Sequence, residues 1–592
     1  MAADPTDGDD YVRVADAAQL REQGRAVVAA DGQAIALFHH EGELFAVDNR
    51  CPHMGFPLER GSVEDGVLTC HWHHARFELR EGDTFDIWAD DVQTFPVEAR
   101  DGEVYVDPDP EPDVPPATRW RNRLADGLQE NLPLVMAKAV LGLDSVAQRA
   151  TEPRDGADGF YTPLETAVNF GTKYRAAGWG RGLTTMGAMA NLYDELARPE
   201  RKRAVFAGLA SVADDCAGEP PRFQQYPLEN RSLSTARLKS WFRDNCEVRD
   251  ADGAERTLLT AVGSLPPADV AEVVLAAATD HLYMDRSHTL DFLNKAFETV
   301  EHLGWEDHAA PVLASTVEAI TGATRMEERS AWRQPVDVAS LCFDAHEALP
   351  ELVAAGENRE WERPEGFLET LLGDDPEAVV DALTDAVRAG ATAEQLTDAV
   401  ADAATLRVAR FATSNEFSDW NTVHHTFSYA TAARRMAART DAVEAYRPAF
   451  DGAVSVYLDR FLNSPRAPLP EPGDADRDPA AVREELLACF DEQGQVDEAG
   501  RLVGEHFDAG GDPAALKRTL GEGLLREDAG FHTLQNVEAA FRRVADTPDP
   551  SMRRTALVAT ARYVAAHSPT RREAEQTFTI AEQLHRGEAV HE

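Results

Sequence analysis

The N-terminal part of the chain alternates between short runs rich in valine, phenylalanine and tyrosine and two-residue turns that contain glycine. Asp31-Gly32 and Asp101-Gly102 are two of these turns, and glycine supplies the positive φ that a tight hairpin requires. The pattern predicts a small, all-β, antiparallel domain over residues 1–106. We expect its strands at residues 11–15, 25–30, 33–38, 43–49, 95–99 and 103–106.

Alternating prolines and acidic residues at 107–117 follow the last of these strands and predict a stiff linker. Beyond the linker, apolar residues recur three and four positions apart, as in residues 396–411, which is typical of α-helices. Thr392 and Gln395 form a capping-box pattern just before that run. We therefore expect a multidomain chain in which a large, all-α, repeat-like region follows the β domain. Its expected parts are an α-helical domain at 118–463, a proline-rich break at 464–479 and a C-terminal helical segment at 480–592.

One motif occurs three times in the helical region. His288, His425 and His532 each begin the pattern H-T-Φ-x-x-Φ-x-x-A, in which Φ is an apolar residue. Chance accounts for one such match more easily than for three, so the motif predicts a degenerate repeated helical unit.

The charge of the chain narrows the range of partners. With 104 acidic and 58 basic residues, the formal net charge is −46. Such a charge repels nucleic-acid phosphates and anionic lipid headgroups, so neither nucleic acid nor membrane is an expected partner. The excess of carboxylates and the scarcity of lysine predict a halophilic protein, in which concentrated salt screens the self-repulsion. We expect a cytoplasmic location, because no apolar run is long enough to span a bilayer and residues 1–10 do not resemble an export signal.

The strongest chemical motif lies within the β domain, at residues 51–77. Cys51-x-His53 is followed, after sixteen residues, by Cys70-x-x-His73, so each of two loops offers one cysteine and one histidine. Two thiolates and two imidazoles are the ligands of a Rieske [2Fe–2S] centre. The segment resembles the Rieske-type ferredoxin family over about residues 10–106. The resemblance implies that Cys51 and Cys70 bind one iron of the cluster and that His53 and His73 bind the other.

Zinc is the alternative metal for these four residues, because it also binds two cysteines and two histidines. Zinc fingers, however, pair like ligands in compact spacings, whereas each loop here contributes one of each kind. Two neutral imidazoles leave a Rieske cluster less negative than a four-cysteine cluster, which places its potential at roughly −150 to +300 mV. His71 and His74 flank His73, and the Cys-x-x-His spacing selects His73 as the ligand.

The helical region contains no His-x₄-His pattern of the kind that binds the mononuclear iron of Rieske oxygenases, so a standard oxygenase subunit is not expected. The repeated histidines His288, His425 and His532 are the catalytic candidates, and together with nearby acids they could hold a second metal or a haem. Alternatively, each is a buried polar residue that bridges neighbouring helices. Their pattern resembles that of helical questin-oxidase-like proteins, which act on aromatic polyketides. The acidic residues near them in the sequence are Asp280, Glu416, Asp419 and Asp528.

The glycine-rich stretch at 178–182 lacks the spacing of a dinucleotide-binding loop, and we interpret it as a closely packed helix junction. Electrons must then arrive from another protein, either a reductase or a ferredoxin. We expect a Rieske-type oxidoreductase, monooxygenase-like, that passes single electrons through the cluster to a small organic substrate or to a second redox site in the helical domain. The alternative is an electron carrier whose helical region is a docking or scaffold module.

Overall fold

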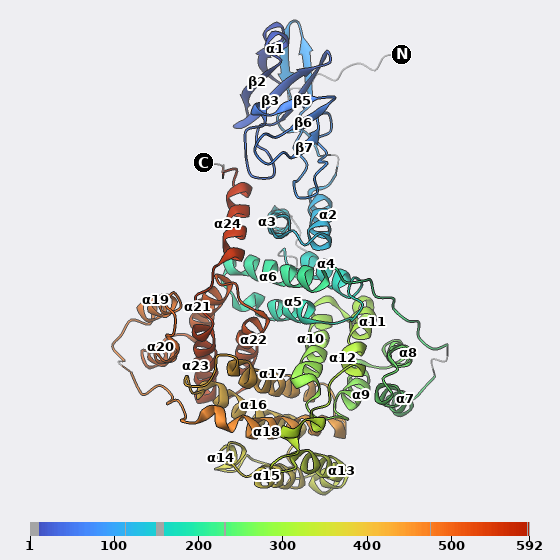
Figure 1. Cartoon of the computed structure of the whole chain (residues 1–592), viewed down its shortest axis with the longest axis vertical. Coiled ribbons are helices and arrows are strands. Elements are labelled where there is room, and N and C mark those ends of the chain that lie inside the picture. The colour runs from blue at the N-terminus through green and yellow to red at the C-terminus, as the bar shows by residue number, and fades with distance from the viewer. Residues whose placement is uncertain are drawn as a thin grey trace. The chain divides into compact units, whose positions relative to one another are not determined.

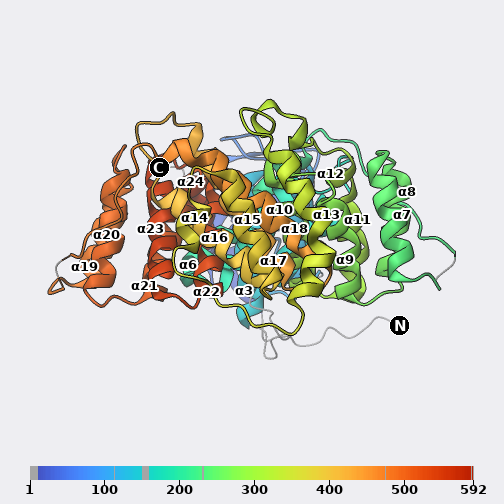
Figure 2. The same ribbon diagram turned by 90° about the horizontal axis from the view of Figure 1, so that it is seen from below.

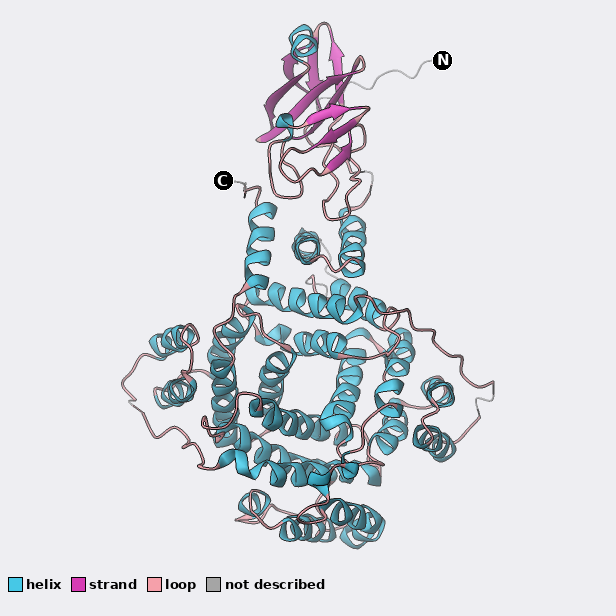
Figure 3. Ribbon diagram, viewed as in Figure 1, coloured by secondary structure: helices cyan, strands magenta, loops and turns pink. Residues whose placement is uncertain are grey.

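The computed structural model describes residues 11–112, 114–149, 159–229, 232–473, 475–588 and 590. The chain forms two compact units, of which the first comprises residues 1–166 and 576–592 and the second residues 167–575. The strands all belong to the first unit, and the described part of the second unit is built from helices and loops (Figure 3). Across the described ranges, none of the helices combines the length and the apolar character needed to cross a bilayer.

The first unit contains three antiparallel sheets of three strands each, with strand orders β1-β9-β8, β2-β3-β4 and β5-β6-β7. The predicted all-β domain is confirmed. The sheet β5-β6-β7 was not predicted, because strands of three residues are too short to show a periodic pattern. The strands are β1 (Val12–Asp16), β2 (Arg25–Ala30), β3 (Gln33–His40), β4 (Glu43–Asp48), β5 (Ser62–Glu64), β6 (Val67–Thr69), β7 (Arg76–Glu78), β8 (Val97–Arg100) and β9 (Glu103–Val106), with helix α1 (Ala17–Gln23) after β1.

The predicted large helical region is also confirmed, and beyond residue 118 the described residues contain no strand. Its helices are α2 (Pro116–Gln129), α3 (Pro133–Arg149), α4 (Tyr161–Gly171), α5 (Arg181–Leu192), α6 (Arg198–Cys216), α7 (Thr235–Glu247), α8 (Ala251–Val262), α9 (Pro267–Ala278), α10 (His288–Leu303), α11 (Trp305–Ser315), α12 (Val317–Thr321), α13 (Val338–Gly356), α14 (Phe367–Leu371), α15 (Pro376–Arg388), α16 (Ala393–Ala409), α17 (Asp419–Ala437), α18 (Arg447–Leu458), α19 (Pro479–Cys489), α20 (Val496–Asp508), α21 (Pro513–Leu525), α22 (Phe531–Asp546), α23 (Pro550–Ala566) and α24 (Glu573–His585).

The second unit is a ring of helical pairs. Figure 1 shows α5, α10, α17 and α22 around a square, with α6, α11, α16 and α23 outside them. Each inner helix packs on its outer partner and on the two neighbouring inner helices. Figure 2 shows α13, α14 and α15 as a further layer, packed on α16 and α18. The ring brings residues of helices that are distant in the sequence close together, and this arrangement creates the histidine site described below.

Local sequence signals account for several helix starts. The predicted capping box is present at α16, where the Gln395 N–H donates to Thr392 Oγ1 at 3.1 Å and the Thr392 N–H donates to Gln395 Oε1 at 3.0 Å. The glycine-rich junction before α5 is tightly packed. A Cβ atom at Gly178, whose φ is +71°, would lie 2.1 Å from the carbonyl oxygen of Ser315. This close approach explains the glycine without a bound phosphate.

Candidate functional site

Two loops of the first unit carry the cysteine and histidine motifs, and they are built alike. Residues 51–56 follow β4, and residues 70–75 follow β6. In each loop the cysteine N–H donates to the carbonyl oxygen five residues later, at 2.8 Å. The residue before that carbonyl is left-handed in both, with φ of 82° at Gly55 and 63° at His74. His74 is therefore a turn-forming residue rather than a ligand. The two bonds join Cys51 to Phe56 and Cys70 to Ala75.

The two loops bring the four predicted ligands together. Cys51 and Cys70 are buried, and their side chains hydrogen bond to each other. This bond lowers the pKa of Cys70 to about 6, with help from the N–H groups of its own loop, so a thiolate is available. The rings of His53 and His73 lie 4.8 Å apart, edge to face. Burial lowers the pKa of His53 to about 4, which keeps its imidazole neutral.

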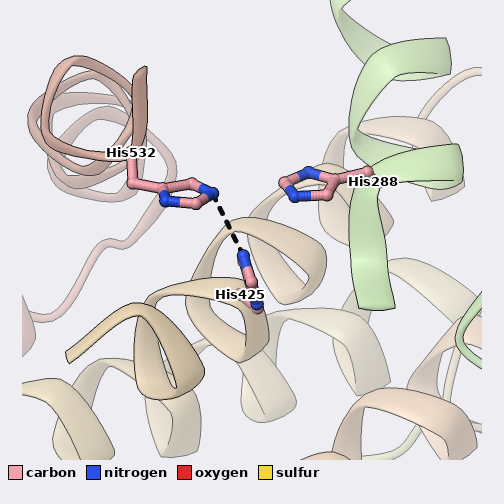
Figure 4. Close-up of side chains that lie close together, drawn as sticks. All are labelled: His288, His425 and His532. Atoms are coloured by element: carbon pink, nitrogen blue, oxygen red, sulfur yellow. Dashed lines mark hydrogen bonds between the residues drawn. The ribbon is translucent and has the colours of Figure 1, made fainter. Parts of the chain in front are cut away.

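A second group of side chains gathers inside the helical ring. His288, His425 and His532 come from the inner helices α10, α17 and α22, and Figure 4 shows their rings pointing toward one another. One ring nitrogen from each histidine lies within 4.8 Å of one ring nitrogen from each of the other two, and the Nε2 atoms of His425 and His532 are 3.1 Å apart. Nitrogens that share one metal ion at about 2.1 Å lie roughly 3.0–3.4 Å apart. The three repeated histidines therefore converge to nearly the spacing of a metal site.

The environment of His425 and His532 favours their neutral form. Burial lowers the pKa of His425 to about 2 and that of His532 to about 4, and the neighbouring His288 adds to both shifts. Neutral imidazoles present the lone pairs that metal ions bind. The Nδ1 atom of His288 is buried, has no hydrogen-bond partner among the described residues and lies 3.9 Å from Asp291 Oδ2. Asp291 in turn accepts a hydrogen bond from Gln535, so a carboxylate is fixed beside the His288 ring.

Three of the four acids expected near these histidines have other partners. Asp280 pairs with Arg243 and Arg447, and Asp528 accepts the N–H groups at the start of α24. Asp419 accepts the N–H of Glu416. Among the described residues of the helical ring, the group with metal-ligand spacing consists of the three histidines and includes none of these four acids. Asp280, Asp419 and Asp528 bind arginine side chains or backbone N–H groups instead.

A cavity of about 330 Å³ lies beside His532. Its walls include the aromatic residues Phe417 and Phe531 and the polar residues Arg181, Asn421 and His567. A volume of this size accommodates a small organic molecule. The helical ring therefore contains a cluster of three imidazoles beside a cavity with space for a small ligand.

Comparison with known proteins identifies the β domain. The model of the Rieske [2Fe-2S] domain family matches residues 10–96. The 3-phenylpropionate/cinnamic acid dioxygenase ferredoxin subunit of Photorhabdus laumondii is 43% identical over 74 residues, a match that covers 12% of this chain and 70% of that protein. The chain belongs to the Rieske [2Fe–2S] family. The predicted Rieske resemblance is thereby confirmed, and with it the [2Fe–2S] cofactor rather than zinc.

Two further relatives extend the comparison. The 4beta-methylsterol monooxygenase of Methylococcus capsulatus is 40% identical over 89 residues, which are 13% of this chain and 24% of that protein. The ferredoxin of carbazole 1,9a-dioxygenase from Nocardioides aromaticivorans is 24% identical, and the match covers 17% of this chain and all of that one, with a TM-score of 0.17. Each match covers less than a fifth of the chain. The similarity of the helical region to questin oxidases stays a prediction.

The donor set fits the cofactor that the Rieske family implies. Two adjacent sulfurs and two adjacent imidazoles face one another, and backbone N–H groups of both loops donate to the sulfurs. When bound, such a cluster supplies reversible one-electron transfer. The His73 ring is exposed, and Trp72 lies 4.3 Å from it. Trp88 lies 4.7 Å from the His53 ring. The imidazole side of the site is therefore open to solvent at His73 and is bordered by the two tryptophan rings.

A buried ion network joins the Rieske domain to the helices that follow it within the first unit. Lys138 of α3 donates to the carbonyl oxygens of Pro52 and His53 at 2.5 and 3.1 Å, and it pairs with Asp90 at 3.1 Å. Arg123 of α2 pairs with the other oxygen of Asp90 at 2.9 Å. All three charged side chains are less than a tenth exposed. A positive charge is thus held against the backbone of the first cluster-binding loop.

Lys138, Asp90 and Arg123 were missed by the sequence analysis, as was Arg181 beside the cavity. One signal for Lys138 was present: it is one of six lysines in the chain and stands inside the apolar run LVMAKAVLGL. A charged residue in a buried helix face needs a partner, which points to an ion pair. No sequence signal identified that partner, because Asp90 lies 48 residues away in a loop.

Proposed function

We propose that this chain is a Rieske oxidoreductase in which the cluster passes single electrons to a metal ion held by His288, His425 and His532, where a small organic substrate is oxidised. The observation that carries the proposal is the convergence of three histidines, two of them held neutral by burial, beside a cavity of about 330 Å³. Electrons enter the cluster from a reductase or another ferredoxin, since the chain has no recognisable nucleotide-binding motif.

The histidine site has the composition of a catalytic metal site rather than a structural one. Structural sites close the coordination sphere with four protein ligands, whereas three ligands leave a position open to water or substrate. Imidazole binds iron, copper and zinc. Because the Rieske cluster donates single electrons, the ion that receives them must be redox-active, as iron is. A monooxygenase-like reaction balances as one dioxygen, two electrons and two protons converting a C–H bond into C–OH with release of one water.

Single-turnover re-oxidation of the cluster tests this proposal. Full-length protein is reduced anaerobically, freed of reductant and mixed with dioxygen, and the cluster absorbance is followed. We expect His425→Ala to slow re-oxidation at least about tenfold while its cluster spectrum stays unchanged, because that variant removes one of three ligands. The matched control is His506→Gln, a buried histidine of α20 whose ring nitrogens contact backbone carbonyls. Equal rates in the wild type and His425→Ala would overturn the proposal.

One observation favours the electron-carrier alternative: the Photorhabdus laumondii relative, matched over 70% of its own length, is a ferredoxin subunit. In that case the helical ring is a docking module and its histidines are structural. A carrier re-oxidises at a rate set by its external acceptor, so the His425→Ala substitution leaves the rate with dioxygen unchanged. The same experiment therefore separates the two functions.

A further inference from the structure

The fourth side of the helical ring differs from the other three. Helices α10, α17 and α22 each contribute one histidine, whereas α5 contributes none to the group. The first residue of α5, Arg181, lines the cavity beside His532 instead. Its guanidinium lies 5.8 Å from the ring centre of Phe531 and close enough to His425 and His532 to lower the pKa of both.

Arg181 forms no ion pair with a carboxylate in the part of the chain that the structure describes. The acids of the cavity wall are used elsewhere: Glu527 binds Thr570 and Arg572, and Asp528 accepts two N–H groups of α24. The chain as a whole has a net charge of −46, yet the guanidinium group of Arg181 gives this cavity wall a positive charge and several N–H donors.

The other polar groups of the cavity add to this donor character. Asn421 uses its side-chain oxygen to accept the Tyr563 hydroxyl at 2.9 Å, which leaves its NH₂ group for a ligand. His567 contacts the carbonyl oxygen of Tyr563 through Nδ1 at 2.8 Å, so its Nε2 atom is the ring nitrogen that could contact a ligand. The apolar part of the wall is aromatic, since Phe417 is 63% exposed and its ring lies 4.8 Å from that of His567.

We propose that this cavity binds a small aromatic molecule that carries a carboxylate. The carboxylate pairs with Arg181, and the ring lies against Phe417 and Phe531. The inference deepens the proposed function, because it names the substrate class of the site at His532. Binding itself requires only the cavity and not the metal, so the two claims can fail separately.

The test measures binding of defined probes to full-length, cluster-containing protein treated with a chelator. Isothermal titration compares 2-naphthoate with its neutral amide and with acetate, which lacks the ring. We expect 2-naphthoate to bind more tightly than either. Arg181→Gln should weaken its binding about ten- to a hundredfold, the usual range for a charge-assisted hydrogen bond, and Arg181→Lys should restore part of the loss.

Arg198→Gln is the matched control, because Arg198 is likewise exposed and is the first residue of an α-helix, α6. It should bind 2-naphthoate as the wild type does. Equal binding of the acid and the amide, an unchanged affinity in Arg181→Gln, or no binding of 2-naphthoate would overturn the inference. Binding that depends on Arg181, together with re-oxidation that is independent of His425, would uphold the ligand class and refute the redox role.

Discussion

Lys138 and Asp459 are both buried, but the surroundings of Lys138 compensate a charge on its side chain, whereas those of Asp459 disfavour one. Lys138 lies among a carboxylate and two carbonyl oxygens, which compensate an ammonium group. Asp459 accepts a hydrogen bond from the Thr426 hydroxyl at 2.6 Å, and burial raises its pKa to about 7 despite that bond and the nearby Arg407. The positive charge of Lys138 thus favours the addition of an electron to the nearby cluster, whereas burial of Asp459 disfavours the charged form of its own carboxyl group.

Replacing Lys138 with Met should lower the reduction potential of the Rieske cluster. Reduction adds an electron, and a positive charge beside the loop stabilises the reduced form, so its loss shifts the potential downward. Potentiometric titration followed by electron paramagnetic resonance measures the shift. Lys138→Arg should retain most of the wild-type potential. Lys239→Met, which removes a lysine paired with Glu272 and Glu444, should leave it unchanged. A wild-type potential in Lys138→Met would contradict the electrostatic role.

Replacing Asp459 with Asn should stabilise the protein relative to the wild type as pH rises. The carboxyl keeps its proton in the folded state up to about pH 7 but loses it near 3.8 when unfolded, so the stability it contributes falls between these values. Between pH 5 and pH 7 the advantage of the variant should grow by about 2–3 kcal/mol. Denaturant unfolding at several pH values measures this change. Asp381→Asn, an exposed position on α15, should show no such trend.

For helices and strands, the sequence predicted those features that depend on residues close together in the chain. Apolar periodicity identified the helical region, and Thr392 with Gln395 marked the start of α16 correctly. The strands β5 to β7 were not predicted, because three residues are too few to distinguish the apolar pattern of a strand from that of a helix or loop. Helix α5 was also not predicted as an inner helix of the ring. It contains no histidine, so its place beside α10 and α22 is visible only in the structure.

Removing the α16 cap should cost stability. In Thr392→Ala the N–H of Gln395 loses its side-chain acceptor, which typically destabilises a protein by about 1 kcal/mol. Thr392→Ser keeps the hydroxyl and should unfold at nearly the wild-type urea concentration. If the urea midpoint of Thr392→Ala equals that of the wild type, the capping box contributes nothing measurable to the second unit.

At the scale of the whole molecule, the four cluster ligands could be predicted because one short segment contains them all. The convergence of His288, His425 and His532 depended on residues that are 137 and 107 positions apart, and the repeated motif was its sole signal. Arg181 and the ion network at Lys138 had no such repeat. Their partners are set by how helices pack, which periodicity does not determine.

The net charge of −46 predicts that dilute buffer weakens the fold. Screening falls as salt is removed, and repulsion among carboxylates then opposes the compact state. Thermal unfolding followed from molar salt downward should show a falling midpoint. Sucrose at matched osmolality should not substitute for salt, because it does not screen charge. A midpoint that is constant or higher in dilute buffer would refute the halophilic interpretation.

The proposed function requires two separate metal centres in one chain, and metal analysis combined with electron paramagnetic resonance detects both. The wild type should contain about two irons and two acid-labile sulfides per chain, plus one further redox-active metal. His73→Ala should lose the cluster signal and keep the additional metal, whereas His425→Ala should lose the additional metal and keep the cluster. A wild-type protein that contains the cluster iron and no other metal would contradict the second metal centre.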